Sequence, residues 1–383
     1  MNESISAFLH ERIDAGDFPS AVYLVAEKGE IVFQDALGYA VVEPERIEAR
    51  LDTIYDLASL TKVLVTGLIT VQRIEDGELQ LDTTIGDILP DFQTGANSKL
   101  NIRHLATHTS GLPGWKPLYF IAKTRLGIGK SIADLASDVK DQNVEYSDLN
   151  FVALAYIAQE KGHRIDIVFG YKVCEELNLT HTSFNPFTEP WQRLLGRAGI
   201  AANENGNEYE MQMCIEKGYL DPDVKNPVAT APGSDMLRTE TIWGEVHDGN
   251  AYFMGGVAGH AGLFSTAEEV FKIALQFLPR YTQLLKPETC KLFRTNFTEG
   301  LNEDRSFAFQ LASTKDSTAG TKMSPESFGH NGFTGTSLWI DPVKERIFVL
   351  LTNRTHMKKP PFVNINSVRR RFHDLAIEAL ESR

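Results

Sequence analysis

Two side chains that can together perform nucleophilic chemistry stand three residues apart, in the stretch Ser59-Leu60-Thr61-Lys62. Residues three apart lie on the same face of a helix, so the hydroxyl and the amine would be neighbours. The apolar run at 63–71 predicts a buried helix that begins at Ser59. Free backbone N–H groups and the positive end of the helix dipole are found there, so an oxyanion beside Ser59 would meet fixed donors. We expect Lys62 to take the hydroxyl proton if burial keeps the amine neutral.

This spacing alone does not identify a nucleophile, because serine at a helix start commonly serves only as an N-cap. The same Ser-x-x-Lys spacing recurs at Ser137 and Lys140. The surroundings separate the two copies. Lys62 is followed by an apolar helix that can bury it, whereas Lys140 is followed by the polar residues 141–143, which stay hydrated.

A tyrosine offers a proton shuttle. Tyr146 precedes the apolar helical run at 151–158, which predicts that it lies in the loop at a helix start. A phenol titrates near pH 10 and is a poor base unless a neighbouring cation lowers its pKa, which Lys62 would do. The alternative is that Tyr146 is a packing residue and that Ser147 or Asp148 caps the helix.

A third candidate stretch, residues 329–337, leads into a predicted strand. Gly332 and Gly335 allow a backbone edge to approach a bound ligand closely, and an N–H there would complete an oxyanion hole. His330 would hold the substrate or Tyr146 by a hydrogen bond. The alternative is an ordinary glycine turn before a strand.

The elements that must position these residues lie at both ends of the chain. Periodicity predicts helices at 4–15 and about 364–381, and β-hairpins built from 21–26 with 31–37 and from 337–340 with 347–352. We therefore predict an α/β fold of the α+β type: one antiparallel sheet completed by both termini, flanked by the terminal helices, with an inserted and mostly helical domain. The predicted boundaries are 1–78 and 265–383 for the α/β domain and 79–264 for the helical domain, with the active-site cleft between them.

Composition limits the partners. The chain has 383 residues, 42% of them hydrophobic, and a net charge of -13, which disfavours nucleic acid and anionic membranes. No apolar run is long enough to cross a bilayer. The N-terminus carries mixed charges and does not resemble a signal peptide, and three widely spaced cysteines indicate reduced thiols. We expect a cytoplasmic protein, or a periplasmic one if a leader has been removed.

The three motifs together are far more specific than any one of them. Ser59-x-x-Lys62, Tyr146-Ser147-Asp148 and His330-Asn331-Gly332 occur in that order, and the chain resembles the serine β-lactamase and penicillin-binding-protein superfamily. The nearer likeness is to its class C branch, which includes D-alanyl-D-alanine carboxypeptidases, D-aminopeptidases and esterases. The resemblance also covers residues 105–113, 246–251, 255–266 and 350–354.

This resemblance implies roles for five residues. Ser59 would be the acylated nucleophile and Lys62 its activating partner. Tyr146 would be the shuttle that later protonates the leaving group. The backbone N–H groups of Ser59 and Phe333 would form the oxyanion hole. His330 would be a further member of the catalytic set.

Two departures from the family pattern bear on the substrate. Asp148 stands where the family usually has asparagine, so it donates no amide hydrogen bond and adds charge beside Lys62. His330-Asn331-Gly332 replaces the Lys-Thr-Gly of many β-lactamases and loses a permanent cation. Asp148, Asn331 and Gly332 are expected to contact the substrate. Arg354 is a candidate anchor for a substrate carboxylate, although a structural role suits it equally.

We predict a serine acyl hydrolase that acts on an ester or a D-amino-acid amide or peptide before a β-lactam, because a protein that is not exported would not meet peptidoglycan. No cofactor is expected. His104 and His108 are spaced to face one metal ion, but no third ligand is evident, so no metal is expected either. The rival interpretation is a non-catalytic ligand-binding or sensor module on the same fold, in which Asp148 and His330 mark lost turnover. The oligomeric state is left open.

Overall fold

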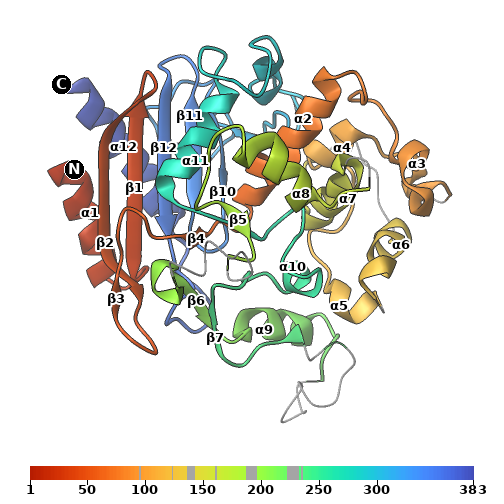
Figure 1. Cartoon of the computed structure of the whole chain (residues 1–383), viewed down its shortest axis with the longest axis horizontal. Coiled ribbons are helices and arrows are strands. Elements are labelled where there is room, and N and C mark those ends of the chain that lie inside the picture. The colour runs from red at the N-terminus through yellow and green to blue at the C-terminus, as the bar shows by residue number, and fades with distance from the viewer. Residues whose placement is uncertain are drawn as a thin grey trace.

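The two ends of the chain meet in one antiparallel sheet. The computed structural model describes residues 1–94, 96–122, 124–135, 143–159, 162–186, 196–221, 233 and 236–383. Seven strands are ordered β3-β2-β1-β12-β11-β10-β9, so the N-terminal strands form one half of the sheet, the C-terminal strands form the other, and the halves join where β1 pairs with β12 (Figure 1). Their bounds are β1 Ser20–Glu27, β2 Glu30–Val41, β3 Ile47–Glu48, β9 Gln310–Leu311, β10 Phe328–Asn331, β11 Ser337–Asp341 and β12 Arg346–Thr352. Both predicted hairpins and the predicted sheet are confirmed.

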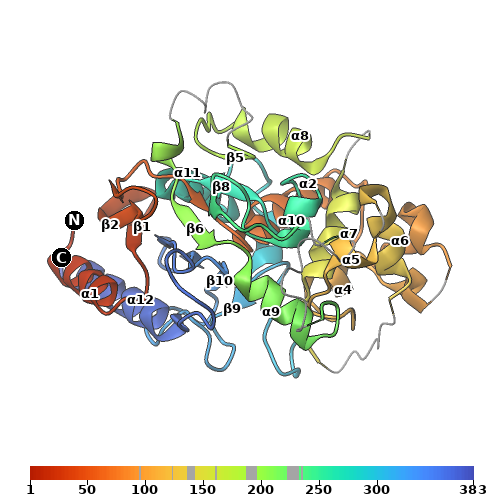
Figure 2. The same ribbon diagram turned by 90° about the horizontal axis from the view of Figure 1, so that it is seen from below.

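The terminal helices cover one face of this sheet. Helix α1 (Glu3–Asp14) packs beside α12 (Asn366–Glu381), and the two termini lie together (Figure 2). Side chains of β1 alternate between the two faces: Tyr23 packs in the cluster with the terminal helices, whereas Leu24 belongs to the cluster beneath the central helix. Both faces are therefore buried, which explains why the strand is apolar throughout.

The central helix carries the first motif through the core. It comprises the π-helical segment η1 (Lys62–Gly67) and α2 (Leu68–Glu75), and every residue from Leu60 to Gln72 is buried. The predicted buried helix is confirmed. The π-helical widening was not foreseen; such segments occur frequently at functional sites.

The remaining helices lie mostly between these elements. Their bounds are α3 Ile85–Ile88, α4 Ile102–Ala106, α5 Leu118–Ile121, α6 Ile128–Ala133, α7 Asp148–Ala158, α8 Ile165–Phe169, α9 Glu208–Glu216, α10 Gly249–Phe253 and α11 Ala267–Ala274. Short 3₁₀ or π turns are η2 Pro90–Phe92, η3 Ala96–Lys99, η4 Arg125–Gly127, η5 Gly170–Cys174, η7 Arg197–Gly199, η10 Leu275–Phe277 and η11 Thr289–Phe293. Helix α11 packs on β1 and β12, on the face opposite the terminal helices.

Two small sheets, which the sequence did not predict, complete the middle of the chain. One has the order β4-β8-β5 and the other pairs β6 with β7. Their strands are β4 Tyr55–Asp56, β5 Ser183–Phe184, β6 Ala202–Asn205, β7 Thr241–Trp243 and β8 Leu263–Ser265. Strands of two to four residues are too short to show an alternating pattern, so sequence periodicity missed them.

The element order supports a division of the chain into 1–78 with 265–383 and 79–264, which we retain as a proposal. The second Ser-x-x-Lys copy, Ser137 and Lys140, lies outside the described residues. Among the helices that the structure describes, none combines the length and the apolar character that a bilayer span requires.

Candidate active site

Ser59 follows a tight turn that joins β4 to the central helix. Ala58 adopts a left-handed conformation with φ of 46°. The Asp56 carboxylate accepts hydrogen bonds from the amides of Ala58 at 2.9 Å and His247 at 2.7 Å. Thr61 Oγ1 donates to the Ala58 carbonyl at 2.6 Å. These bonds fix the turn, so Ser59 enters the cavity at the start of the helix, as predicted.

Lys62 is fully buried and lies among three oxygen atoms. Its Nζ donates to Ser59 Oγ at 2.8 Å and to the His260 carbonyl at 3.2 Å, and it forms an ion pair with Asp148 Oδ1 at 2.7 Å. The structure thus brings the predicted hydroxyl and amine into contact. It also places the unusual Asp148 directly against the amine.

The charge of Lys62 differs from our expectation. Burial lowers the pKa of Lys62. The carboxylate of Asp148 and the neighbouring Tyr146 together raise it by more than burial lowers it, so the net pKa lies above the ordinary 10.5. Lys62 is therefore an ammonium in the resting structure, and the stated condition, that burial keeps the amine neutral, is not met. The sequence indicated that Asp148 adds charge beside Lys62 but did not weigh that charge against burial, and the ion pair decides the balance.

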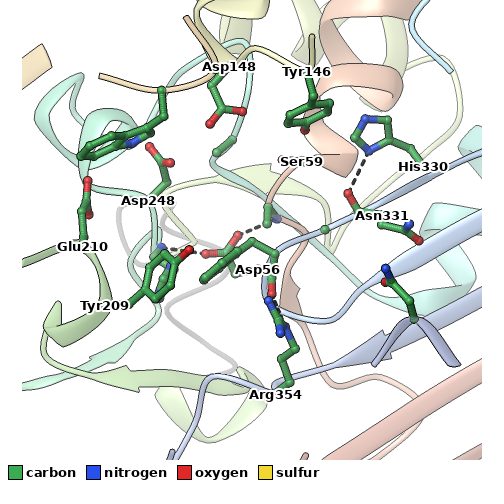
Figure 3. Close-up of a pocket in the computed structure, with 18 of the residues that line it drawn as sticks. Asp56, Ser59, Tyr146, Asp148, Tyr209, Glu210, Asp248, His330, Asn331 and Arg354 are labelled. Atoms are coloured by element: carbon green, nitrogen blue, oxygen red, sulfur yellow. Dashed lines mark hydrogen bonds between the residues drawn. The ribbon is translucent and has the colours of Figure 1, made fainter. Parts of the chain in front are cut away.

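Tyr146 lies in the loop before α7, as predicted, and its phenol points toward Ser59 (Figure 3). Hydrogen bonds to Lys62 and Ser59 favour the phenolate, but burial and Asp148 outweigh them and raise the pKa of Tyr146. Lys62 lowers that pKa, as expected, but burial is the largest effect, and with Asp148 it keeps the net pKa above its usual value. At neutral pH the group is a phenol, which can donate a proton.

The third motif is docked onto the nucleophile turn. Thr334 Oγ1 donates to the Asp56 carbonyl at 2.8 Å, and Thr336 Oγ1 donates to the Leu57 carbonyl at 3.0 Å. A Cβ on Gly332 would lie 2.0 Å from Thr336 Oγ1 and 2.6 Å from the Leu57 carbonyl oxygen. Only glycine fits this close approach to Thr336 and Leu57, whereas the sequence suggested a close approach to a bound ligand.

Two backbone amides beside the nucleophile are available to a ligand. Within the described part of the chain, neither the Ser59 amide nor the Phe333 amide donates a hydrogen bond to another residue. The docking of the third motif brings the Phe333 segment next to the turn that carries Ser59. This arrangement suits a carbonyl oxygen that becomes negative during reaction.

His330 does not make the hydrogen bond expected with Tyr146. Its Nδ1 donates to the Asn331 carbonyl at 2.9 Å, and its ring centroid is 5.8 Å from that of Tyr146. Burial, Lys62 and Arg305 lower the pKa of His330 well below its usual range. A neutral imidazole therefore stands where a permanent cation stands in many β-lactamases.

Two predicted substrate-binding side chains are engaged with the protein itself. Asn331, the last residue of β10, donates a hydrogen bond from Nδ2 to Thr318 Oγ1 at 2.9 Å. Its side-chain amide is therefore oriented by Thr318. Arg354 donates to the carbonyls of Phe333 at 2.6 Å and Val363 at 2.7 Å, and its guanidinium lies 4.9 Å from the centre of the Phe333 ring. Arg354 therefore fixes the Phe333 segment, and it also lines the cavity.

These residues surround one cavity of about 610 Å³ (Figure 3).

Two further carboxyl groups, Glu210 and Asp248, line this cavity. Burial and Asp248 raise the pKa of Glu210 to about 8. Burial would also raise the pKa of Asp248, but His260 and the Ala251 amide lower it below the usual range. Asp148 and Asp248 thus present carboxylates to the cavity. Residues that line it include Ser59, Tyr146, Asp148, Asp248, His330 and Arg354.

Sequence reasoning missed two contributors to this site. The His260 carbonyl accepts from Lys62, and it belongs to the 255–266 stretch, which the family resemblance covered without assigning it a role. The Arg305 guanidinium lies 5.7 Å from the centre of the Tyr146 ring and forms an ion pair with Glu303 at 2.7 Å. Arg305 stands in an irregular segment with no recognisable pattern, so no sequence signal pointed to it.

His104 and His108 make separate contacts. His104 Nδ1 accepts from the Asn101 amide in a capping box at α4, whereas His108 Nδ1 accepts from the Ser147 amide at 3.0 Å. Among the described residues, no group of three potential metal ligands is assembled.

A family model described as Beta-lactamase matches residues 5–369. A putative D-alanyl-D-alanine carboxypeptidase of Escherichia coli K12 is 30% identical over 385 aligned residues, which cover 91% of this chain and 81% of the relative. The protein of the same description from Salmonella agona is 28% identical, covering 92% and 82%.

Solved structures with the same fold include the following three. EstCE1, a hydrolase with promiscuous acyltransferase activity, has a TM-score of 0.70 at 20% identity and covers 98% of this chain and 97% of its own. Simvastatin synthase from Aspergillus terreus has a TM-score of 0.71 at 18% identity, covering 99% and 98%. A penicillin-binding protein homologue from Pyrococcus abyssi has a TM-score of 0.68 at 17% identity, covering 98% and 77%. At these identities the likeness shows the fold alone.

Proposed function

We propose, from the premise that the chain belongs to the Beta-lactamase family and is a serine hydrolase of that fold, that it works through an acyl-enzyme on Ser59. The observation that carries this proposal is the 2.8 Å hydrogen bond between Lys62 Nζ and Ser59 Oγ, inside a cavity that also holds the Tyr146 phenol. The substrate is an ester or a D-amino-acid amide or peptide. The chemistry is supplied by side chains of the chain itself.

Acylation begins when Ser59 Oγ attacks the substrate carbonyl carbon. Because Lys62 rests as an ammonium paired with Asp148 at 2.7 Å, it passes one proton to Asp148 before it takes the proton of Ser59. The total charge of the pair is unchanged by that transfer. The carbonyl oxygen becomes negative between the amides of Ser59 and Phe333, whose dipoles are already oriented.

Tyr146 then donates its proton to the leaving group, and the bond from the carbonyl carbon to that group breaks. The raised pKa of Tyr146 suits a donor rather than a base. Lys62 returns the phenol proton. Water next attacks the acyl-enzyme, and the same groups act in reverse to release the acid and restore Ser59.

The substrate preference follows from the charges near Ser59. Asp148 and Asp248 face the cavity as carboxylates, and His330 is neutral. The carboxylates of Asp148 and Asp248 would repel an anionic β-lactam, and the neutral His330 offers it no fixed cation. Penicillinase activity is therefore expected to be the weakest. The expected cytoplasmic location, which stays a prediction, favours the same order.

A carboxypeptidase acting on D-alanyl-D-alanine is the second candidate, because relatives of that description align over most of both chains. Arg354 is the proposed anchor for the substrate carboxylate in that case, since it lines the cavity. Its hydrogen bonds to the backbone carbonyls of Phe333 and Val363 engage Nε and Nη1.

Intact-protein mass spectrometry tests the acyl-enzyme. A fluorophosphonate should add its mass to the wild type and to Ser137→Ala, which alters the second Ser-x-x-Lys copy, but not to Ser59→Ala. No covalent adduct with a fluorophosphonate, a penicillin or an ester would favour the non-catalytic binding module instead.

Initial rates rank the substrates. A short-chain nitrophenyl ester should be hydrolysed faster than a D-Ala-D-Ala peptide, and the peptide faster than a chromogenic cephalosporin. Peptide turnover without ester turnover would reverse the order in favour of the carboxypeptidase.

A further inference from the structure

His108 holds the segment that carries Tyr146 at three points. Its backbone carbonyl accepts from the Glu145 amide at 2.9 Å, and its Nδ1 accepts from the Ser147 amide at 3.0 Å. Its imidazole also lies against the Tyr146 ring, with centroids 4.6 Å apart and planes inclined by 32°. The residues immediately before and after Tyr146 are thus both tied to His108, and so is the ring between them.

We propose that His108 is a positioning residue that holds the Tyr146 phenol where it can protonate the leaving group. This inference rests on the proposed function, in which Tyr146 is the proton donor. His108 itself acts through Tyr146, because it is fully buried behind that ring and does not line the cavity.

The hydrogen bonds of His108 fix its chemical form. An amide N–H can only donate, so Nδ1 must carry a lone pair toward Ser147, and the ring proton of the neutral imidazole is on Nε2. Burial, Arg305 and Lys62 lower the pKa of His108 well below its usual range. The ring therefore stays neutral beside the Lys62 ammonium and keeps its acceptor for the Ser147 amide.

Histidine at position 108 carries two energetic costs, one in its backbone and one in its side chain, and packing alone does not account for them. His108 has φ of 59°, a left-handed conformation that a side chain other than glycine or asparagine adopts at a cost. Its Nε2 is buried and has no hydrogen-bond partner among the described residues. An apolar residue would avoid the second cost, and glycine or asparagine the first, but none of them would supply both the acceptor and the ring.

Two substitutions separate these contributions. His108→Asn tolerates the left-handed backbone and keeps an acceptor for Ser147, but it loses the ring. His108→Phe keeps a ring against Tyr146 and loses the acceptor. Each variant is assayed on esters that share one acyl group and differ only in the leaving group, from nitrophenol through phenol to a simple alcohol.

The leaving group supplies the readout. Nitrophenolate departs without a proton, whereas an alkoxide needs one from Tyr146. We expect kcat/KM for the alkyl ester to fall about 10- to 100-fold more than kcat/KM for the nitrophenyl ester in both variants. Partial unfolding lowers both rates by the same factor, so it leaves this ratio unchanged.

Three further variants complete the design. Tyr146→Phe should show the largest fall in the ratio of kcat/KM for the alkyl ester to kcat/KM for the nitrophenyl ester. The double variant His108→Asn with Tyr146→Phe should lower this ratio no further than Tyr146→Phe alone. His373→Asn removes another fully buried imidazole, on α12, whose Nδ1 bonds to the Thr318 carbonyl, and should leave the ratio as in the wild type.

The outcomes distinguish the two claims. If Tyr146→Phe changes the ratio but the His108 variants slow all esters equally, the positioning role is wrong and the proposed function stands. If Tyr146→Phe itself leaves the ratio unchanged, Tyr146 is not the proton donor, and both claims fall together.

Discussion

Asp148→Asn removes the carboxylate that lies 2.7 Å from the fully buried Lys62 ammonium and keeps the shape of the side chain. At an effective dielectric constant of about 20, two unit charges at that distance attract by about 6 kcal/mol, an upper bound on the interaction lost. Burial, which opposes the ammonium, then has little to balance it. We expect the pKa of Lys62 to fall below its ordinary 10.5 in this variant.

The sign of the pH dependence of stability should reverse. In the wild type the pKa of Lys62 is raised, so its contribution is fully present below pH 10.5 and is lost as the pH rises above that value. In the variant, between the lowered pKa of folded Lys62 and pH 10.5, the unfolded chain binds a proton that the folded chain does not. The free energy of unfolding should therefore rise with pH toward pH 10.5, by at most about 1.4 kcal/mol per pH unit.

Urea unfolding between pH 7 and 10 measures this difference. Asp134→Asn is the matched control, because it breaks an exposed pair with Lys130 and should change stability by less than about 1 kcal/mol with no new slope. The acid limb of kcat/KM should also move to lower pH in Asp148→Asn, since a lower pKa of Lys62 leaves more of the amine neutral at a given pH. Parallel stability profiles for Asp148→Asn and wild type would refute the reasoning that Asp148 holds the proton on Lys62.

Three other substitutions test the site. Lys62→Met should slow acylation by a fluorophosphonate about 10²- to 10⁴-fold; labelling at the wild-type rate would exclude Lys62 as the activating group. Gly332→Ala should lower kcat about 100-fold or more, because its Cβ would meet Thr336 Oγ1 at 2.0 Å and displace an oxyanion donor, whereas Gly170→Ala, with nothing within 4 Å, should keep wild-type kcat. Burial raises the pKa of Glu210 from 4.5 to about 8, so its contribution to stability is present below pH 4.5 and lost as the pH rises through 8; Glu210→Gln should flatten the urea midpoint over that window, and an unchanged slope would count against a protonated Glu210.

Local patterns predicted much of the framework. The hairpins formed by β1 with β2 and by β11 with β12 have apolar strands of five to twelve residues, long enough for periodicity to be visible. The contact between Ser59 and Lys62 follows from a spacing of three residues on a helix, even though the ladder there is π-helical. Such contacts depend on neighbours in the chain, so the sequence displays them directly.

Other features depend on segments that are distant in sequence. The strands β5, β6 and β7 are defined by their partners more than by their own two to four residues. The orientation of Asn331 is set by Thr318, and the loop holding Tyr146 is set by His108. No motif contained either pairing.

The sequence by itself determined which groups are available for catalysis: a hydroxyl, an amine and a phenol, with Ser59 and Lys62 one helical turn apart. The tertiary structure alone decided the protonation states of these groups. Lys62 is an ammonium because the fold brings the Asp148 carboxylate to 2.7 Å inside a buried site. A pKa reports the sum of burial and of every nearby charge, and the fold assembles those contributions from separate parts of the chain.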